Sequence, residues 1–298
     1  MMAVAGYSSY IANIVFSAIL GYTAIMLNSI TIHAIRKASS LPKPLKTLLL
    51  SLAVSDVCVG LVQPFHIAVH VMKLEPGAEN NPTFKKAFLA YLSLGNLLYY
   101  TTFFGVVALT VDRFLAIHLH LRYQELVTHK RVVVAVISMW VFGAIISSLT
   151  ALLDTTQTDR YAVFASLELF CLTISAVLYF KIYLAVRHHA NQMHALHVQQ
   201  EAQNVEITEM ANAARLRKLA VGTFFVYLVF LICYLPMNCI YFATFFAGWS
   251  STVDGLVHYA LSLVFLNSSL NSLIYCWKMR HIRHAILDIL RKIWPSRN

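Results

Sequence analysis

Seven long apolar runs, separated by short polar segments, dominate the hydropathy pattern of this chain. They lie near residues 10–35, 45–72, 84–117, 130–152, 160–187, 214–246 and 252–277. A helix that spans a bilayer needs about 20 apolar residues, and every run reaches that length. The pattern therefore predicts seven membrane-spanning helices. The polar segments leave no room for a separate soluble domain, so we expect residues 1–298 to form one domain.

A different pattern follows the seventh run. Apolar residues recur at helical spacing from Met279 through Ile282, Ile286 and Ile289, with basic residues between them. This spacing predicts an amphipathic helix over 279–293 that lies on the membrane surface, and its charge density argues against an eighth span. The predicted fold class is thus an all-α membrane protein, a seven-transmembrane helix bundle with a C-terminal amphipathic interfacial helix.

Composition supports this interpretation and orients the bundle. Of the 298 residues, 59% are hydrophobic and 12% are charged, and the mean hydropathy is +0.66, which is too apolar for a water-facing surface. If the N-terminus is extracellular, 19 of the 23 Lys and Arg residues fall on the cytoplasmic side. The net charge of +10 then reflects topology and contact with anionic membrane lipids, not nucleic-acid binding. We expect a multi-pass protein of the plasma membrane.

Polar side chains inside the apolar runs are candidates for function, because a polar group in lipid is costly. One group combines Asp56 of the second run with Thr102, Asn267, Ser268 and Asn271 of later runs. Carboxylate, hydroxyl and amide oxygens are the ligands that a small hard cation such as sodium prefers. The alternative is a set of hydrogen bonds that join helices, and both functions are compatible.

Two features suggest a conformational switch. Asp112 and Arg113 close the third run, where an ion pair at the cytoplasmic end of a spanning helix would face a soluble partner. Pro236 in the sixth run removes one backbone hydrogen bond and predicts a kinked helix that can act as a lever. A static kink is the alternative.

The motifs in these runs resemble a known family. They are Asn28, Leu52-Ala53-Val54-Ser55-Asp56, Asp112-Arg113-Phe114, Trp140, Tyr179, Cys233-Tyr234-Leu235-Pro236 and Asn267-Ser268-Ser269-Leu270-Asn271-Ser272-Leu273-Ile274-Tyr275. In order and placement they resemble the rhodopsin-like (class A) G protein-coupled receptors over essentially the whole chain. The nearest branch is that of the melanocortin, cannabinoid and adenosine receptors. Phe114, Tyr234 and Ser272 depart from the usual Tyr, Trp and Pro of the family.

The resemblance implies a receptor that passes an extracellular signal to a heterotrimeric G protein by outward movement of the sixth helix. The residues that match the activation switch are Asp112, Arg113, Phe114, Tyr179, Tyr234, Pro236, Asn271 and Tyr275. Arrestin is a second expected partner, although the chain after residue 293 offers only one hydroxyl, Ser296. We expect no enzyme activity and no cofactor beyond the candidate sodium ion.

The candidate ligand site is a mixed aromatic and polar set near the outer half of the runs. Its residues are His66, His70, Asn96, Tyr99, Glu168, Tyr234, Asn238, Tyr241, His258 and Phe265. Such a lining suits a small molecule, a lipid or the tip of a peptide. By the resemblance, Gly95 stands where amine receptors carry Asp, and Phe265 stands where opsins carry the retinal Lys. The sequence leaves the ligand unassigned.

Two other functions fit the same pattern. A non-signalling receptor-like membrane protein would be disabled by Tyr234 and Ser272. A transporter would use Asp56 and Glu168 as an ion path, but it should show inverted repeats or paired broken helices, and the sequence shows neither.

Overall fold

The computed structural model describes residues 4–38, 41–73, 75, 77–119, 122–152, 157–197, 204–248 and 250–293. In this part of the chain the structure is helical and contains no strand. The elements are α1 (Val4–Lys37), α2 (Lys43–Lys73), η1 (Ala78–Asn80), α3 (Pro82–His118), α4 (Tyr123–Leu126), α5 (His129–Leu152), α6 (Gln157–His197), α7 (Asn204–Ala247), α8 (Ser251–Lys278) and α9 (Arg280–Ile293).

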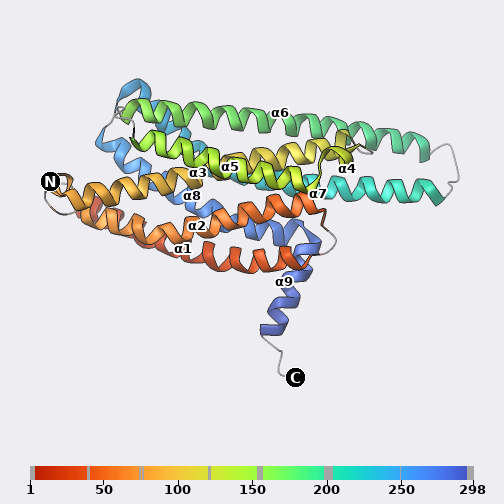
Figure 1. The fold of residues 1–298 in the computed structure, drawn as a ribbon, viewed down its shortest axis with the longest axis horizontal. Helices are drawn as coiled ribbons and strands as arrows, with labels where there is room; N and C mark the ends of the chain where they lie inside the picture. Colours follow the sequence, from red (N-terminus) through yellow and green to blue (C-terminus); the bar gives the residue numbers. More distant parts are fainter. Residues whose placement is uncertain are drawn as a thin grey trace.

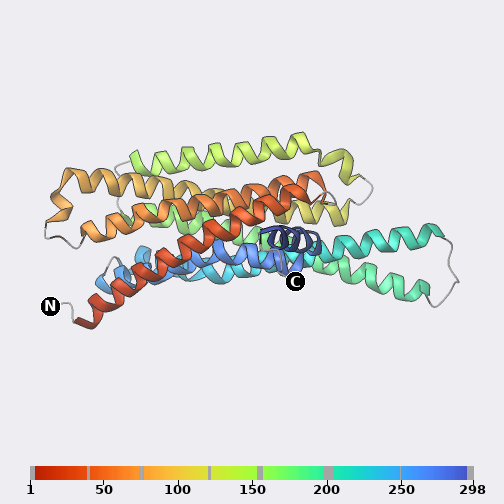
Figure 2. The ribbon, with the colours of Figure 1, turned by 90° about the horizontal axis from the view of Figure 1, so that it is seen from below.

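Seven of the described helices are long and apolar enough to cross a membrane, which confirms the predicted fold class. In chain order the spans are α1, α2, α3, α5, α6, α7 and α8, so α7 is the sixth span and α8 the seventh. They run along one common axis (Figures 1 and 2). Helix α1 packs on both α2 and α8, which closes the bundle, and α3 contacts α2, α5, α6 and α7. Helix α3 is therefore the central helix of the bundle.

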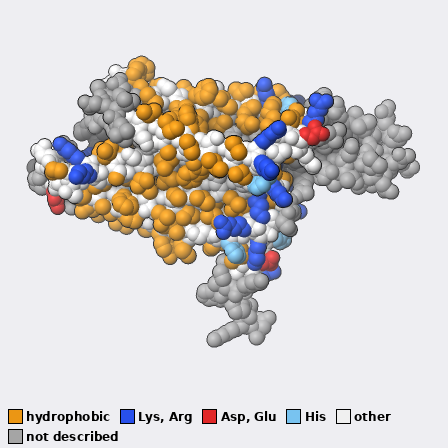
Figure 3. All heavy atoms as spheres, in the orientation of Figure 1, with side chains coloured by type: hydrophobic (Ala, Val, Ile, Leu, Met, Phe, Trp, Pro, Cys, Tyr) orange, Lys and Arg blue, Asp and Glu red, His pale blue; other side chains and the backbone are white. Residues whose placement is uncertain are grey.

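The bundle has apolar side chains outside and polar side chains inside. A continuous hydrophobic surface covers its middle, while Lys and Arg gather toward the ends (Figure 3). Large apolar side chains such as Phe170 and Ile232 lie on the outside, whereas Asn28, Asp56 and Asn267 are fully buried. The bundle also has a large hydrophobic core, so the buried polar side chains lie among apolar ones. Apolar side chains outside and polar side chains only inside are expected of helices that face lipid, because the bilayer core offers no hydrogen bonds to a polar side chain.

Helix α1 and helix α2 approach each other at glycines. A Cβ added to Gly60 would lie only 2.6 Å from the backbone oxygen of Gly21. Small residues allow this close backbone contact, which replaces the missing hydrophobic driving force between helices in lipid. The contact sets the position of α2, which carries Asp56, His66 and His70 into the bundle.

Helices α6 and α7 extend together well beyond the other helices (Figure 1). The sequence predicts this extension, because the polar segment between the fifth and sixth runs lacks Pro and Gly. The side chains of residues 188–216 lie outside the described part of the structure. Helix α7 remains helical across Pro236, which leaves the backbone oxygen of Ile232 without its usual helical partner.

Helix α9 runs crosswise to the bundle axis and packs on α1 and α8 (Figures 1 and 2). Ile282 and Ile289 are buried against the bundle, whereas Arg280 and Arg291 are exposed. The helix is therefore amphipathic, as its sequence predicts. The short helices η1 and α4 are not predicted by the hydropathy pattern, because each has only three or four residues.

Candidate functional site

Asp56 lies at the centre of the bundle. Its side chain is fully buried, and Asn271 Nδ2 donates a hydrogen bond to Asp56 Oδ2 over 3.0 Å. Among the described residues, Asp56 Oδ1, Asn271 Oδ1 and both polar atoms of Asn267 have no hydrogen-bond partner. Thr102 and Ser268 are buried as well. The structure thus joins Asp56 to Asn271 directly and leaves buried oxygens that can bind a small cation or water.

Ser272 has a contact that the sequence did not predict. Its hydroxyl donates to Asn28 Oδ1 over 2.7 Å, and Asn28 Nδ2 donates in turn to the backbone oxygen of Ser268 over 2.8 Å. Seventh-span residues four positions apart therefore hold one Asn of α1 from both sides. Where the family has a proline, this chain has a hydroxyl that joins α8 to α1. Residues four positions apart share one face of a helix, and this spacing is visible in the sequence. The sequence does not show that this face of α8 meets Asn28 of α1.

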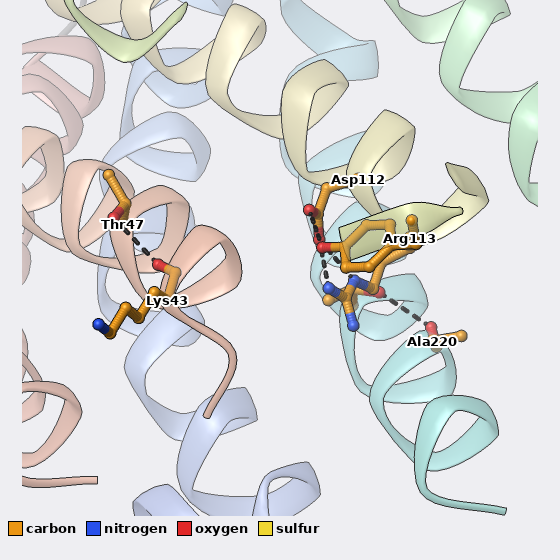
Figure 4. Close-up of polar contacts among 7 residues, drawn as sticks. Lys43, Thr47, Asp112, Arg113 and Ala220 are labelled. Atoms are coloured by element: carbon orange, nitrogen blue, oxygen red, sulfur yellow. Dashed lines mark hydrogen bonds and ion pairs between the residues drawn. The ribbon is translucent and has the colours of Figure 1, made fainter. Parts of the chain in front are cut away.

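The Asp112–Arg113 pair lies near the C-terminal end of α3 (Figure 4). Arg113 is only 1% exposed, and its Nε donates to Asp112 Oδ2 over 2.9 Å, with Nη2 also bonded to the same oxygen. Among the described residues, Arg113 Nη1 has no hydrogen-bond partner. The pair lies beside the segment of α7 that contains Ala220 (Figure 4). Asp112 therefore holds the buried guanidinium on its own helix.

Tyr123 completes this contact from the short helix α4. Its hydroxyl donates to Asp112 Oδ1 over 2.7 Å, so the two carboxylate oxygens of Asp112 serve Tyr123 and Arg113 separately. Partial burial, together with the nearby Asp112 charge, raises the pKa of the Tyr123 hydroxyl. The hydroxyl consequently stays protonated and remains a donor at neutral pH. Tyr123 is not among the predicted site residues, because the hydropathy pattern indicates only a loop at that position.

The remaining switch residues pack between α3, α6, α7 and α8. Tyr179 stacks on Tyr227 with 5.1 Å between ring centroids, and the Tyr227 hydroxyl donates to the backbone oxygen of Leu172 on α6 over 3.1 Å. Tyr275 is fully buried, and its hydroxyl has no partner among the described residues. Phe114 is half-buried beside His118. Tyr179 and Tyr275 thus already lie inside the bundle in this conformation.

The candidate ligand residues separate into two clusters. The first, here called the inner acid cluster, comprises Tyr99, Glu168, Tyr234, Asn238 and Tyr241. Glu168 is 1% exposed, its Oε2 accepts a hydrogen bond from the Tyr99 hydroxyl, and its Oε1 has no partner among the described residues. The Tyr99 and Tyr234 rings are 5.3 Å apart. Asn238 Nδ2 donates to the backbone oxygen of Ala165, one helical turn from Glu168.

The second group, here called the outer histidine cluster, comprises His66, His70 and His258 with Tyr10, Tyr91 and Phe265. It lies near the first turns of α1 and α8 and the last turns of α2. The His66 ring is 4.0 Å from the His70 ring and 5.3 Å from Phe265, and the His66 Nδ1 atom is 2.9 Å from the Tyr91 hydroxyl. The sequence did not predict Tyr10 or Tyr91.

Asn96 joins neither cluster by a hydrogen bond within the described part of the chain. It lies half-buried on α3, one turn before Tyr99 and Tyr100. Nearby, a Cβ added to Gly95 would meet no atom within 4 Å. A side chain at position 95 would therefore extend into open space.

Comparison with known proteins agrees with this arrangement. Residues 27–164 and 154–275 match the family described as 7 transmembrane receptor (rhodopsin family). The chain belongs to this receptor family. The human adenosine receptor A2a is 25% identical over 97% of this chain and 74% of its own length. The chicken adenosine receptor A2b is 26% identical over 94% and 88%, and the dog adenosine receptor A3 is 23% identical over 97% and 95%.

The relatives place the receptor near the adenosine receptors, one of the three groups in the branch that the motifs indicate. Members of the family are signalling receptors, so the expectation that the chain is not an enzyme is confirmed. The family also implies a heterotrimeric G protein as partner.

The receptor's Asp112–Tyr123 bond gives a testable prediction. Replacing Tyr123 with Phe removes the hydrogen bond to Asp112 and should loosen its hold on Arg113. A hydrogen bond of this kind contributes about 1 kcal/mol or more, so we expect about a fivefold rise in ligand-independent G protein activation. The measurement is basal signalling normalised to surface expression. Tyr183→Phe, which removes an exposed hydroxyl from α6, is the matched control. Equal basal activity in the two variants would contradict the prediction.

Proposed function

We propose that this receptor transmits an extracellular signal to a heterotrimeric G protein by outward movement of α7. The observation that carries the proposal is the buried Arg113, held by Asp112 beside α7 at one end of the bundle. A ligand that favours the tilted position of α7 would shift the population toward it. Arg113 would then leave Asp112 and contact the G protein.

The charge distribution supports the proposed orientation. The end of the bundle with Arg113 also carries Lys43, Lys46, Lys278 and the basic helix α9. Positive residues on one side of a membrane protein are typical of the cytoplasmic side. We therefore propose an extracellular N-terminus, a plasma-membrane location and contact of α9 with anionic lipid of the inner leaflet. Arrestin is a further proposed partner.

The test of G protein coupling compares the intact receptor with Arg113→Ala in cells that carry a panel of Gα biosensors. We expect a ligand-free signal in at least one channel, with its loss in the variant at equal surface expression, because Arg113 would supply the contact with the G protein. An unchanged signal in Arg113→Ala would contradict the proposed switch. Surface expression without signal in any channel would favour the non-signalling receptor-like alternative.

The inner acid cluster is the proposed centre of the ligand site. Glu168 has one carboxylate oxygen without a hydrogen-bond partner among the described residues, and the neighbouring Tyr99 donates to the other. An acceptor of this kind binds a ligand that carries an N–H or O–H donor. Asn96, His66, His258 and Phe265 complete the predicted lining. This chemistry, and the relatives' name as adenosine receptors, favour a small molecule with donor groups, and adenosine is the first compound to test.

Glu168→Gln tests this assignment. The change keeps the size of the side chain but removes its charge, so the charge-assisted hydrogen bond to the ligand weakens. We expect the potency of adenosine, or of the most potent compound from a small-molecule screen, to fall about tenfold or more, which corresponds to about 1.4 kcal/mol. Surface expression should be unchanged. Glu75→Gln, at an exposed position, is the control. Equal potency in both variants would remove Glu168 from the site.

We also propose that Asp56 binds an allosteric sodium ion together with Thr102, Asn267, Ser268 and Asn271. The support is the group of buried oxygens of Asp56, Asn267 and Asn271 that have no partner among the described residues. Oxygen atoms of this type suit a hard cation, whose charge would compensate the buried carboxylate. Sodium bound there would favour the conformation described here.

If sodium binds at Asp56, the thermal stability of the receptor should depend on sodium and not only on ionic strength. The melting temperature of the purified receptor should be higher in sodium chloride than in choline chloride at the same ionic strength. Asp56→Asn should abolish the difference, because the amide carries no charge to balance the cation. Asp288→Asn on the exposed face of α9 should keep it. A sodium effect that survives in Asp56→Asn would place the ion elsewhere.

A further inference from the structure

The outer histidine cluster brings together three imidazole rings from two helices. His66 and His70 lie one turn apart on α2, and His258 lies near the start of α8. The His70 and His258 rings are 4.8 Å apart, with His70 Nε2 only 3.2 Å from His258 Nδ1. We propose that His70 and His258 form a binding site for Zn²⁺, or for another divalent cation that prefers imidazole, at the outer end of the receptor.

The tautomer of His70 is suited to metal binding. Its Nδ1 atom is 2.8 Å from the backbone oxygen of His66. A carbonyl oxygen only accepts hydrogen bonds, so Nδ1 carries the proton and the neutral ring presents an unprotonated Nε2. Metal-binding histidines commonly donate their other N–H to a carbonyl in this way, which fixes the ring and raises the basicity of the binding nitrogen. In His70 that nitrogen points toward His258.

The spacing of the two nitrogens also fits a metal ion. Zn–N bonds are about 2.0–2.1 Å long and the geometry is tetrahedral, so two nitrogen ligands of one zinc ion lie about 3.3 Å apart. The observed 3.2 Å between His70 Nε2 and His258 Nδ1 is close to this value. A metal ion would replace the shared hydrogen bond once His258 carries its proton on Nε2 instead of Nδ1.

The surroundings of the pair hold it in place. The Tyr10 hydroxyl donates to the backbone oxygen of His70 over 3.3 Å, and its ring meets the His258 ring edge-on at 5.1 Å. His66 contacts Tyr91, and exposed Lys73 lies one turn beyond His70. The described residues contain no group of three or more His, Cys, Asp or Glu side chains arranged around a metal. Of the described residues, His70 and His258 would each supply one nitrogen ligand to the ion.

A bound ion would link α2 to α8. Both helices also meet at the centre of the bundle, where Asn271 of α8 donates to Asp56 of α2. A metal link between the same two helices, nearer their outer ends, would favour the arrangement in which His70 and His258 are close. The ion would therefore shift the receptor population toward this arrangement of α2 and α8.

The experiment measures the melting temperature of the purified receptor at increasing concentrations of ZnCl₂, at pH 7.5. We expect Zn²⁺ to stabilise the protein and Mg²⁺ or Ca²⁺ at equal concentration to have no comparable effect, since these ions prefer oxygen ligands. His70→Ala and His258→Ala should each raise the half-maximal Zn²⁺ concentration at least about tenfold. Acidification to pH 5.5 should weaken the effect, because imidazole binds metal in its neutral form.

His33→Ala, which removes an exposed histidine from α1, is the matched control and should titrate like the unchanged receptor. His70 is buried, so if His70→Ala does not fold, the Zn²⁺ titration of His258→Ala, at a half-buried position, tests the proposal by itself. A Zn²⁺ response that persists in His258→Ala, or no response in the unchanged receptor, would overturn the proposal. The binding assay needs neither a ligand nor a G protein, so its result is independent of the signalling function proposed above.

Discussion

The bilayer core supplies no hydrogen bonds, and most of this structure is a consequence of that constraint. Every backbone polar group in the core must find its partner within the protein, which restricts the spans to helices. Polar side chains must turn toward other helices for the same reason. The result is an apolar exterior around an interior that contains Asn28, Asp56, Glu168 and Asn267. Contacts between these interior groups join helices that are far apart in the chain.

Some of these buried side chains have a hydrogen-bond partner for every polar atom, and others do not. Asn28 is bonded on both sides by α8, at the Ser268 backbone and the Ser272 hydroxyl, which makes it a structural joint. Asp56, Arg113 and Glu168 differ, because each has at least one polar atom bonded and another without a hydrogen-bond partner among the described residues. A buried charged group that is only half-satisfied is costly. These three groups are accordingly the ones for which we propose external partners: a cation, a G protein and a ligand.

The three groups are spread along the bundle, and helix α3 links two of them. It carries Tyr99, which contacts Glu168, and it ends at Asp112 and Arg113. Because α3 also packs on α7, a change in the inner acid cluster can reach the Arg113 end through one helix pair. The packing of Phe103 and Phe230 against Tyr234 lies between the two sites. In the proposed mechanism, Tyr234 would couple ligand binding to movement of α7.

The sequence by itself determined the fold class and the family, since apolar runs of bilayer length and local motifs depend on residues that are near each other in the chain. The seven spans and the amphipathic face of α9 follow from such local patterns. Only the tertiary structure decided which distant side chains meet. It joined Ser272 to Asn28, brought Tyr123 to Asp112, and divided the candidate ligand residues into the inner acid cluster and the outer histidine cluster. Helical periodicity gives the face on which a residue lies, but helix packing decides which other helix that face meets.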